Sequence, residues 1–225
     1  MSSHAVPPTH IYVLLDRSGS MESIASDVVG GFNQFIKEQS AVGTNVRVTL
    51  VQFDSEDPQE VLAPAVPIAE ITPLTLKTFR PRGSTPLLDA TGRLIGRARL
   101  NQEVRATNKL ETEDIIFVTV TDGEENASRE FSLGRIQSLV ADCEKEGWTF
   151  VFLSAALDAY GDAHRLGLKT GNIQGFDASG DGAGLAFASL SKNMTARRSK
   201  RASGAALMSE DFFEDKEAED HRNDR

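Results

Sequence analysis

The chain has 225 residues, a formal net charge of −9 and a single cysteine, Cys143. This length predicts one domain of roughly 200 residues with a tail; the charge argues against nucleic-acid binding, and one cysteine excludes an internal disulfide bond. No apolar run reaches the ~18 residues of a membrane span, and the N-terminus lacks the pattern of a secretory signal. We therefore expect a soluble, cytoplasmic, monomeric protein that binds no membrane and no nucleic acid.

The first half of the chain alternates between strand and helix patterns. An apolar run predicts a strand at residues 11–15, and apolar residues at helical spacing predict a helix over residues 24–39. Residues 46–53 alternate and are rich in β-branched types, which predicts a second strand. Residues 59–68 predict an edge strand, because their two prolines cannot serve a central hydrogen-bonding ladder.

The second half of the chain continues this alternation. Gly147 follows a helical pattern and is a typical C-terminal signal. The predicted helices cover residues 86–100, 133–146, 158–166 and 183–197, and the predicted strands cover residues 115–121, 148–155 and 173–176.

Alternating strands and helices imply right-handed crossovers and a mainly parallel sheet that helices cover on both faces. We therefore predict an α/β fold with a doubly wound, mostly parallel sheet. We expect an N-terminal extension at residues 1–8, one domain over residues 9–197 and a charged tail over residues 198–225. Apart from Phe212 and Phe213 the acidic tail has few apolar residues, so we expect disorder; the alternative is a short peptide that docks into a partner.

Three polar segments fall where the predicted strands and helices meet. Asp16, Ser18 and Ser20 follow the first strand within five residues, Thr85 precedes a helix, and Asp122 follows the strand at residues 115–121. Carboxylate and hydroxyl oxygens are hard ligands that suit Mg²⁺, Mn²⁺ or Ca²⁺. Because ligands bind at the carboxyl ends of the strands in α/β sheets, these segments predict one cation site.

The Asp-x-Ser-x-Ser motif, together with Thr85 and Asp122, resembles the metal-ion-dependent adhesion site (MIDAS) of von Willebrand factor type A (VWA) domains. The resemblance covers about residues 9–197 and implies a Rossmann-like fold with one short antiparallel edge strand, here residues 59–68. It also implies that Ser18 and Ser20 coordinate the cation directly, and that Thr85 does so directly or through water. Asp16 and Asp122 would act close by, often through bridging waters.

The resemblance further implies a metal-dependent protein-binding module rather than an enzyme. Mg²⁺ is the expected ion, with Mn²⁺ or Ca²⁺ as alternatives, and an acidic side chain of a partner protein would complete its coordination. Stand-alone domains of this family also resemble parts of chaperone-like or stress-response assemblies, so an adaptor role is expected.

Other interpretations stay open at this stage. Asp16, Ser18 and Ser20 could form only a helix cap, and the metal site could be vestigial in a scaffold protein. A metal-dependent phosphatase-like hydrolase is a second alternative, for which Lys109 is the only lysine between Thr85 and Asp122. Further acidic residues near these motifs could lie close to the metal, although a solvated turn, a surface position or a cap is the simpler role: Asp54, Asp89, Glu124 and Glu125.

Overall fold

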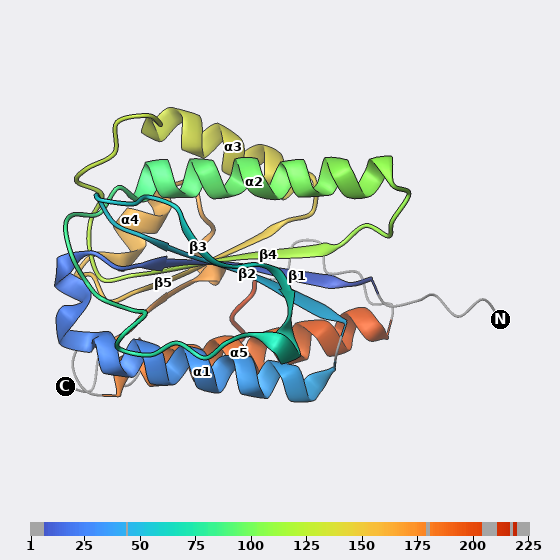
Figure 1. Ribbon diagram of the computed structural model, residues 1–225, viewed down its shortest axis with the longest axis horizontal. Helices are drawn as coiled ribbons and strands as arrows, with labels where there is room; N and C mark the ends of the chain where they lie inside the picture. Colours follow the sequence, from blue (N-terminus) through green and yellow to red (C-terminus); the bar gives the residue numbers. More distant parts are fainter. Residues whose placement is uncertain (1–6, 44, 179–180, 204–210, 217, 220–225) are drawn as a thin grey trace.

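The protein is described by a computed structural model that covers residues 7–43, 45–178, 181–203, 211–216 and 218–219. Six strands form one sheet in the order β3-β2-β1-β4-β5-β6 (Figure 1). Only the pairing of β2 with β3 is antiparallel, and the four other pairings within the described sheet are parallel. The strands are β1 (Thr9–Asp16), β2 (Val46–Phe53), β3 (Glu60–Pro67), β4 (Asp114–Thr121), β5 (Thr149–Ser154) and β6 (Ile173–Gly175).

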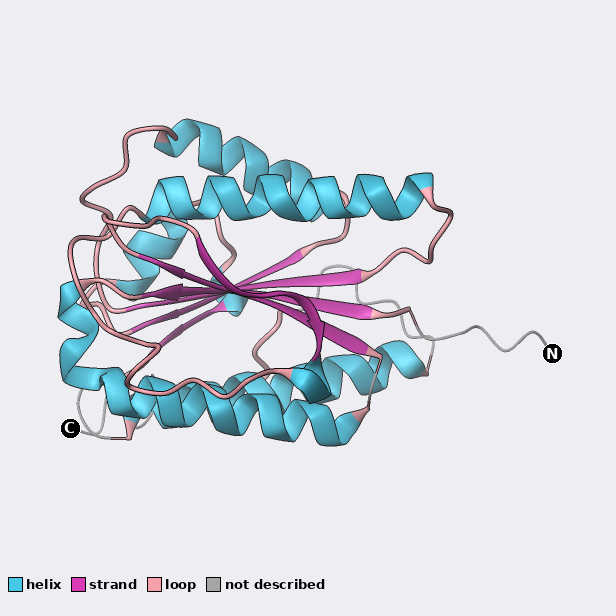
Figure 2. Cartoon of the chain, viewed as in Figure 1, coloured by secondary structure: helices cyan, strands magenta, loops and turns pink. Residues whose placement is uncertain are grey.

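Helices cover both faces of this sheet, so the molecule has three layers (Figure 2). One helical layer contains α2, α3 and α4, and the other contains α1 and α5 (Figure 1). No helix of the described residues is both long and apolar enough to span a membrane. The helices are α1 (Ala25–Val42), α2 (Leu87–Thr107), α3 (Leu133–Lys145), α4 (Ala159–Arg165) and α5 (Gly182–Ala202), with short 3-10 helices η1 (Gly19–Ile24), η2 (Ile68–Glu70) and η3 (Thr170–Asn172).

The central strands β1 and β4 are buried along their whole length. A parallel sheet with helices on both faces exposes neither side of its central strands, which explains why these segments read as continuous apolar runs. In the register of the two strands, Leu15 pairs with Val120. Their carboxyl ends are therefore level with each other, which brings the residues after β1 next to those after β4.

The two helical layers each enclose an apolar core. Between α1 and α5, Phe187 contacts Phe32 edge-on at a ring-centroid distance of 6.2 Å. Gly31 makes this approach possible, since a Cβ built there would lie 2.6 Å from Phe187 Cδ2. The sheet edge position of β3 agrees with the prediction from its prolines, and a register irregularity lies opposite it between Val48 and Leu50.

Two helices extend past their predicted ends. α2 continues to Thr107 and α5 to Ala202, so α5 crosses the expected domain boundary at residue 197. The added part of α5 is held by charge, because Arg201 approaches the buried Asp114 Oδ1 at 3.1 Å, as does Arg197 at the predicted end of the helix. The last turns of α5 contain few apolar residues, and they are stabilised by ion pairs with Asp114, the first residue of β4.

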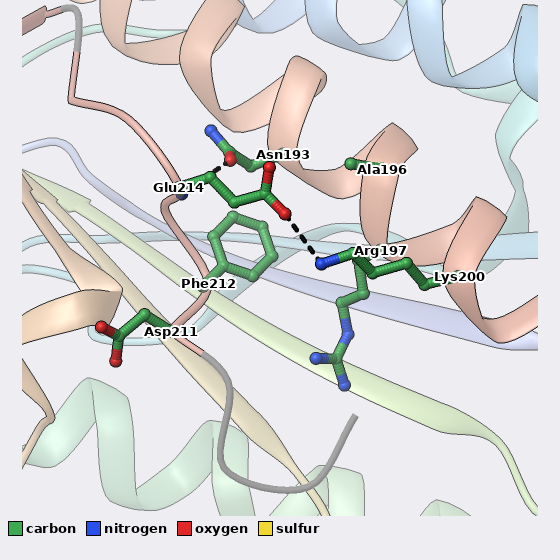
Figure 3. A pocket seen from close by; sticks show the side chains of 7 residues that line it. All are labelled: Asn193, Ala196, Arg197, Lys200, Asp211, Phe212 and Glu214. Carbon is green, nitrogen blue, oxygen red and sulfur yellow. Dashed lines mark hydrogen bonds and ion pairs between the residues drawn. The ribbon is translucent and has the colours of Figure 1, made fainter. Parts of the chain in front are cut away.

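The described part of the tail packs on the domain, which differs from the expectation of a disordered segment. Phe212 and Phe213 are 5% and 4% exposed and belong to the core beneath α1 and α5. The Glu214 amide donates to Asn193 Oδ1 at 3.1 Å, and Lys200 Nζ donates to Glu214 Oε1 at 2.8 Å (Figure 3). Two aromatic rings thus offset the ordering cost of a segment whose composition is otherwise polar. Residues 204–210, 217 and 220–225 lie outside the described part.

Candidate metal site

The predicted site residues come together at the carboxyl edge of the sheet, on the left of Figure 1. Asp16 ends β1, and Ser18 and Ser20 lie in the turn into η1. Asp122 follows the last residue of β4. Thr85 lies just before α2, in a loop that returns to this edge. The aligned ends of β1 and β4 explain why segments about 100 residues apart in sequence meet.

Asp16 is fully buried and organises the first loop. Its Oδ1 accepts a hydrogen bond from the Ser18 amide at 2.7 Å, and its Oδ2 accepts one from Thr121 Oγ1 at 2.6 Å. Burial raises the pKa of Asp16 to about 6, although these hydrogen bonds act in the opposite direction. Asp16 therefore lies beneath the loop and joins it to the end of β4.

Above Asp16, side-chain oxygens form a continuous chain. Ser18 Oγ lies 3.1 Å from Ser20 Oγ, and Ser20 Oγ donates to Asp122 Oδ1 at 2.8 Å. Ser18 is buried, whereas Ser20 reaches solvent. Partial burial raises the pKa of Asp122, while the bond from Ser20 opposes that shift. These contacts bring together side chains that sequence analysis placed in one site from two separate segments.

Thr85 completes the group from the third loop. A Cβ built on Gly123 would lie 3.5 Å from Thr85 Oγ1 and 3.6 Å from Ser20 Oγ, so both hydroxyl oxygens flank the space above Gly123. Asn126 fixes the threonine backbone from both sides. Its Oδ1 accepts from the Thr85 amide at 2.9 Å, and its own amide donates to Thr85 O at 3.1 Å.

The donor set fits a hard divalent cation. It combines three hydroxyl oxygens with two carboxylates, which are ligand types suited to Mg²⁺, Mn²⁺ or Ca²⁺. Within the described ranges, no group of three or more His, Cys, Asp or Glu side chains could hold a metal ion. A site built on hydroxyls contains too few of those residues to form such a group. The residues that would hold the cation are Ser18, Ser20 and Thr85, with Asp16 and Asp122 alongside.

A buried charge cluster ties the first loop to the threonine loop. The Arg17 guanidinium donates to Asp54 Oδ2 at 2.9 Å, and Arg82 donates to the same oxygen at 2.9 Å. Burial raises the pKa of Asp54, but the bond from Arg82, backbone bonds in its own turn and the charge of Arg17 outweigh this and lower it. Asp54 is thus a buried anchor for two arginines, not a surface residue.

Backbone contacts complete the connection between these loops. The Gly19 amide donates to Gly83 O at 3.1 Å, and the Arg82 amide donates to Arg17 O at 2.9 Å. Gly83 has φ = 64°, and a Cβ there would lie 2.5 Å from Ser55 Oγ, so glycine is needed on both grounds. From this loop the sequence singles out only Thr85, and it does not predict the connection to the first loop.

Two acidic residues join the loop after Asp122 to the start of α2: Glu125 lies in the loop and Asp89 in the helix. Glu125 Oε2 accepts from the Leu88 amide at 2.8 Å, and Glu125 Oε1 accepts from two amides of its own turn. Asp89 accepts from the backbone amides of residues 129–131. A solvated turn therefore describes the exposed Glu124 but not Glu125, which fixes the loop to the helix. The sequence pattern predicts no role for Thr121 or Asn126, because their partners lie on other segments of the chain.

The chain resembles several solved structures. It shares 17% identity with proximal thread matrix protein 1 from the mussel byssus, at a TM-score of 0.55 over 85% of this chain and 47% of that one. It shares 11% with a von Willebrand factor type A protein from Catenulispora acidiphila, at a TM-score of 0.51 over 85% and 43% of the two chains. It shares 15% with the manganese-loaded TRAP protein of Plasmodium vivax, at a TM-score of 0.50 over 80% and 71%.

The chain spans less than half the length of the first two of these proteins. No protein-family model matches the sequence, and no curated protein does. At these identities the likeness concerns the fold. The sheet order, its one antiparallel edge strand and the helices on both faces agree with it. The chain therefore has the von Willebrand factor type A fold.

Proposed function

We propose that the chain is a divalent-metal-dependent module that binds an acidic residue of a partner protein. One observation carries the proposal: Ser18, Ser20 and Asp122 form a connected chain of oxygens, and Thr85 Oγ1 faces the same space above Gly123. A helix cap alone would not bring the third loop to this point. Mg²⁺ is the proposed ion, and the manganese bound to TRAP supports a divalent cation without fixing which one.

The chemistry of the loop favours capture of a carboxylate. Both oxygens of Asp16 already accept hydrogen bonds, from the Ser18 amide and from Thr121 Oγ1, so part of its negative charge is neutralised within the protein. Neutral hydroxyls add no charge to the inner shell. A bound cation would keep most of its charge and would attract a carboxylate as a further ligand.

A protein partner fits this chemistry better than nucleic acid, because the chain carries a net charge of −9. We propose that the module acts as a cytoplasmic monomer, as an adaptor to a chaperone-like or stress-response assembly. The adaptor role rests on the family resemblance, whereas the proposed contact with a partner carboxylate rests on the geometry of the site.

The hydrolase alternative has less support. It needs a lysine near the metal, and Lys109 lies beyond the end of α2, before the amino end of β4. The eight residues of β4 separate that end from Asp122, a span of roughly 25 Å at about 3.3 Å per residue. Position 18, where an aspartyl-phosphate enzyme needs its second acid, is a serine. We propose that the chain is not an enzyme.

The proposed function predicts that a free carboxylate changes the affinity of the chain for Mg²⁺, and this effect can be measured. Mg²⁺ is titrated calorimetrically into the full chain in the presence of millimolar glutamate or, as the neutral match, glutamine. We expect tighter Mg²⁺ binding with glutamate, because each ligand favours binding of the other. The Ser18→Ala, Ser20→Ala double variant should lose this binding. Equal affinity with both amino acids would contradict carboxylate capture, and full affinity in the double variant would contradict the site.

A further inference from the structure

A cavity of about 260 Å³ opens beside the candidate metal site. Its place follows from the chain, because Leu87 and Leu88 come directly after the Thr85 loop and Glu124 comes directly after Asp122 and Gly123. One wall is thus continuous with two of the three loops that form the metal site. A partner residue bound at the cation would have its neighbours within reach of this cavity.

Half of the residues that line the cavity are leucines from three helices or their ends: Leu87, Leu88, Leu133 and Leu166. Leu133 begins α3 and is 37% exposed, so part of this apolar lining reaches solvent. These leucines would favour a partner group with an aliphatic stem.

The other residues that line the cavity are charged. They are the carboxylates of Glu124, Glu125 and Asp162 and the single guanidinium of Arg165, which donates to Asp162 Oδ1. Asp162 is 7% exposed, and its Oδ2 has no hydrogen-bond partner among the described residues. Burial, with a contribution from the charge of Glu124, raises the pKa of Asp162. With three carboxylates and one guanidinium, the lining carries an excess of negative charge.

We propose that this cavity binds a lysine side chain of the partner protein, next to the acidic residue that the metal would hold. The proposal rests on the proposed function for the identity of the partner as a protein. Lysine matches both kinds of lining residue: its methylene stem covers the leucines, and its ammonium group donates to the exposed Glu124. A neutral aliphatic side chain would leave the carboxylates uncompensated, and an acidic one would be repelled.

Small probes test this subsite directly. Backbone amide shifts of the full chain are followed while Nα-acetyl-lysine methylamide is added, and Nα-acetyl-norleucine methylamide serves as the uncharged match. We expect saturable shifts of the amides of Leu88, Leu133 and Leu166 with the lysine compound, and roughly fivefold weaker binding of the norleucine compound. Equal binding of both compounds, or no saturable shift at these amides, would overturn the proposal.

Two variants separate the subsite from general charge effects. Glu124→Gln changes an exposed side chain that lines the cavity, and Glu103→Gln changes an exposed glutamate near the far end of α2. The lysine compound should bind several-fold more weakly to the first variant and unchanged to the second. Equal weakening in both would contradict a specific site.

The outcome is independent of the metal. The same titration is run with EDTA and in Asp122→Ala, where lysine binding should persist because neither change touches the cavity wall. Loss of lysine binding under either condition would contradict a separate subsite. Failure of Mg²⁺ binding with intact lysine binding would instead count against the proposed function alone.

Discussion

The space above Gly123 decides whether the hydroxyls of the candidate site can share one ion. Thr85 Oγ1 and Ser20 Oγ flank this space, and a methyl group there would make only ordinary contacts of 3.5 and 3.6 Å with them. The glycine is therefore not required for packing. Its missing side chain leaves the space between the two hydroxyls open, and the proposed cation would lie there.

At this scale we predict that Gly123→Ala folds normally but binds Mg²⁺ about tenfold more weakly, a loss of ~1.4 kcal/mol. The added methyl group would fill the space between the two hydroxyls. Isothermal titration measures the affinity, and thermal unfolding checks the fold. Gly96→Ala is the matched control, because a Cβ there meets nothing within 4 Å. Unchanged affinity in Gly123→Ala would show that the ion does not sit between these residues.

At the scale of elements, Glu113 connects the amino ends of two strands with α2. It is 6% exposed, and it contacts His10 of β1, Arg47 of β2 and Arg105 of α2. Burial raises its pKa, but hydrogen bonds from His10 and Gln102, together with the nearby positive charges, lower it to about 2. A depressed folded pKa contributes stability above the unfolded value of about 4.5, and this stability is lost as the pH falls toward 2.

We therefore predict that the wild-type free energy of unfolding drops by about 3 kcal/mol over this acid range through Glu113 alone. Glu113→Gln should be less stable at neutral pH, since Arg47 and Arg105 lose their partner, and should depend less on pH below 4.5. Urea unfolding at a series of pH values measures both effects. Glu111→Gln, at an exposed neighbouring position, is the control. Parallel pH curves for Glu113→Gln and wild type would contradict this role.

The tail segment contacts α5, β6 and the 3-10 helix η3, which directly precedes β6. The Phe212 amide donates to Asn172 Oδ1 at 2.9 Å, and the Phe213 amide donates to Gly171 O at 3.0 Å. Glu219 Oε1 accepts from the Gly175 amide at 2.8 Å, which extends the contact to the edge strand. The segment also needs Gly171, because a Cβ there would lie 1.9 Å from Asp211 Cγ.

We predict that Gly171→Ala lowers the free energy of unfolding by about 1–3 kcal/mol and increases proteolytic cleavage near the tail. The added methyl group overlaps Asp211 and displaces the segment. Gly184→Ala in α5 serves as the control, because a Cβ there meets nothing within 4 Å. Urea unfolding and limited proteolysis measure the two effects. Equal stability of the two variants would mean that the tail contributes nothing to the fold.

At the scale of the whole molecule, the sequence predicted the sheet correctly, and it predicted which polar residues would lie together at the carboxyl edge of that sheet. Continuous apolar runs mark β1 and β4, and polar residues directly after them must meet, because parallel strands end at one edge. Both α2 and α5 extend beyond the ends that local apolar periodicity predicts. Arg105 in the last turn of α2 pairs with Glu113, and Arg201 in the last turn of α5 pairs with Asp114.

The parts that sequence analysis missed depend on contacts between separate loops. Asn126 holds Thr85, Asp54 joins Arg17 to Arg82, and neither pairing leaves a local pattern. The tail shows the same limit. Its acidic composition predicts disorder, whereas the burial of Phe212 and Phe213 depends on the surface that the rest of the chain offers.

Isothermal titration of Mg²⁺ and Mn²⁺ into the full chain tests the central claim, that three loops assemble one cation site. Wild type is compared with Asp122→Ala, which removes the acceptor of the Ser20 hydroxyl, and with Ser26→Ala, an exposed serine of α1 that contacts Asp27. We predict binding of one ion per chain by wild type and by Ser26→Ala, and its loss in Asp122→Ala. Full binding by Asp122→Ala, or no binding by wild type even with glutamate present, would contradict the account.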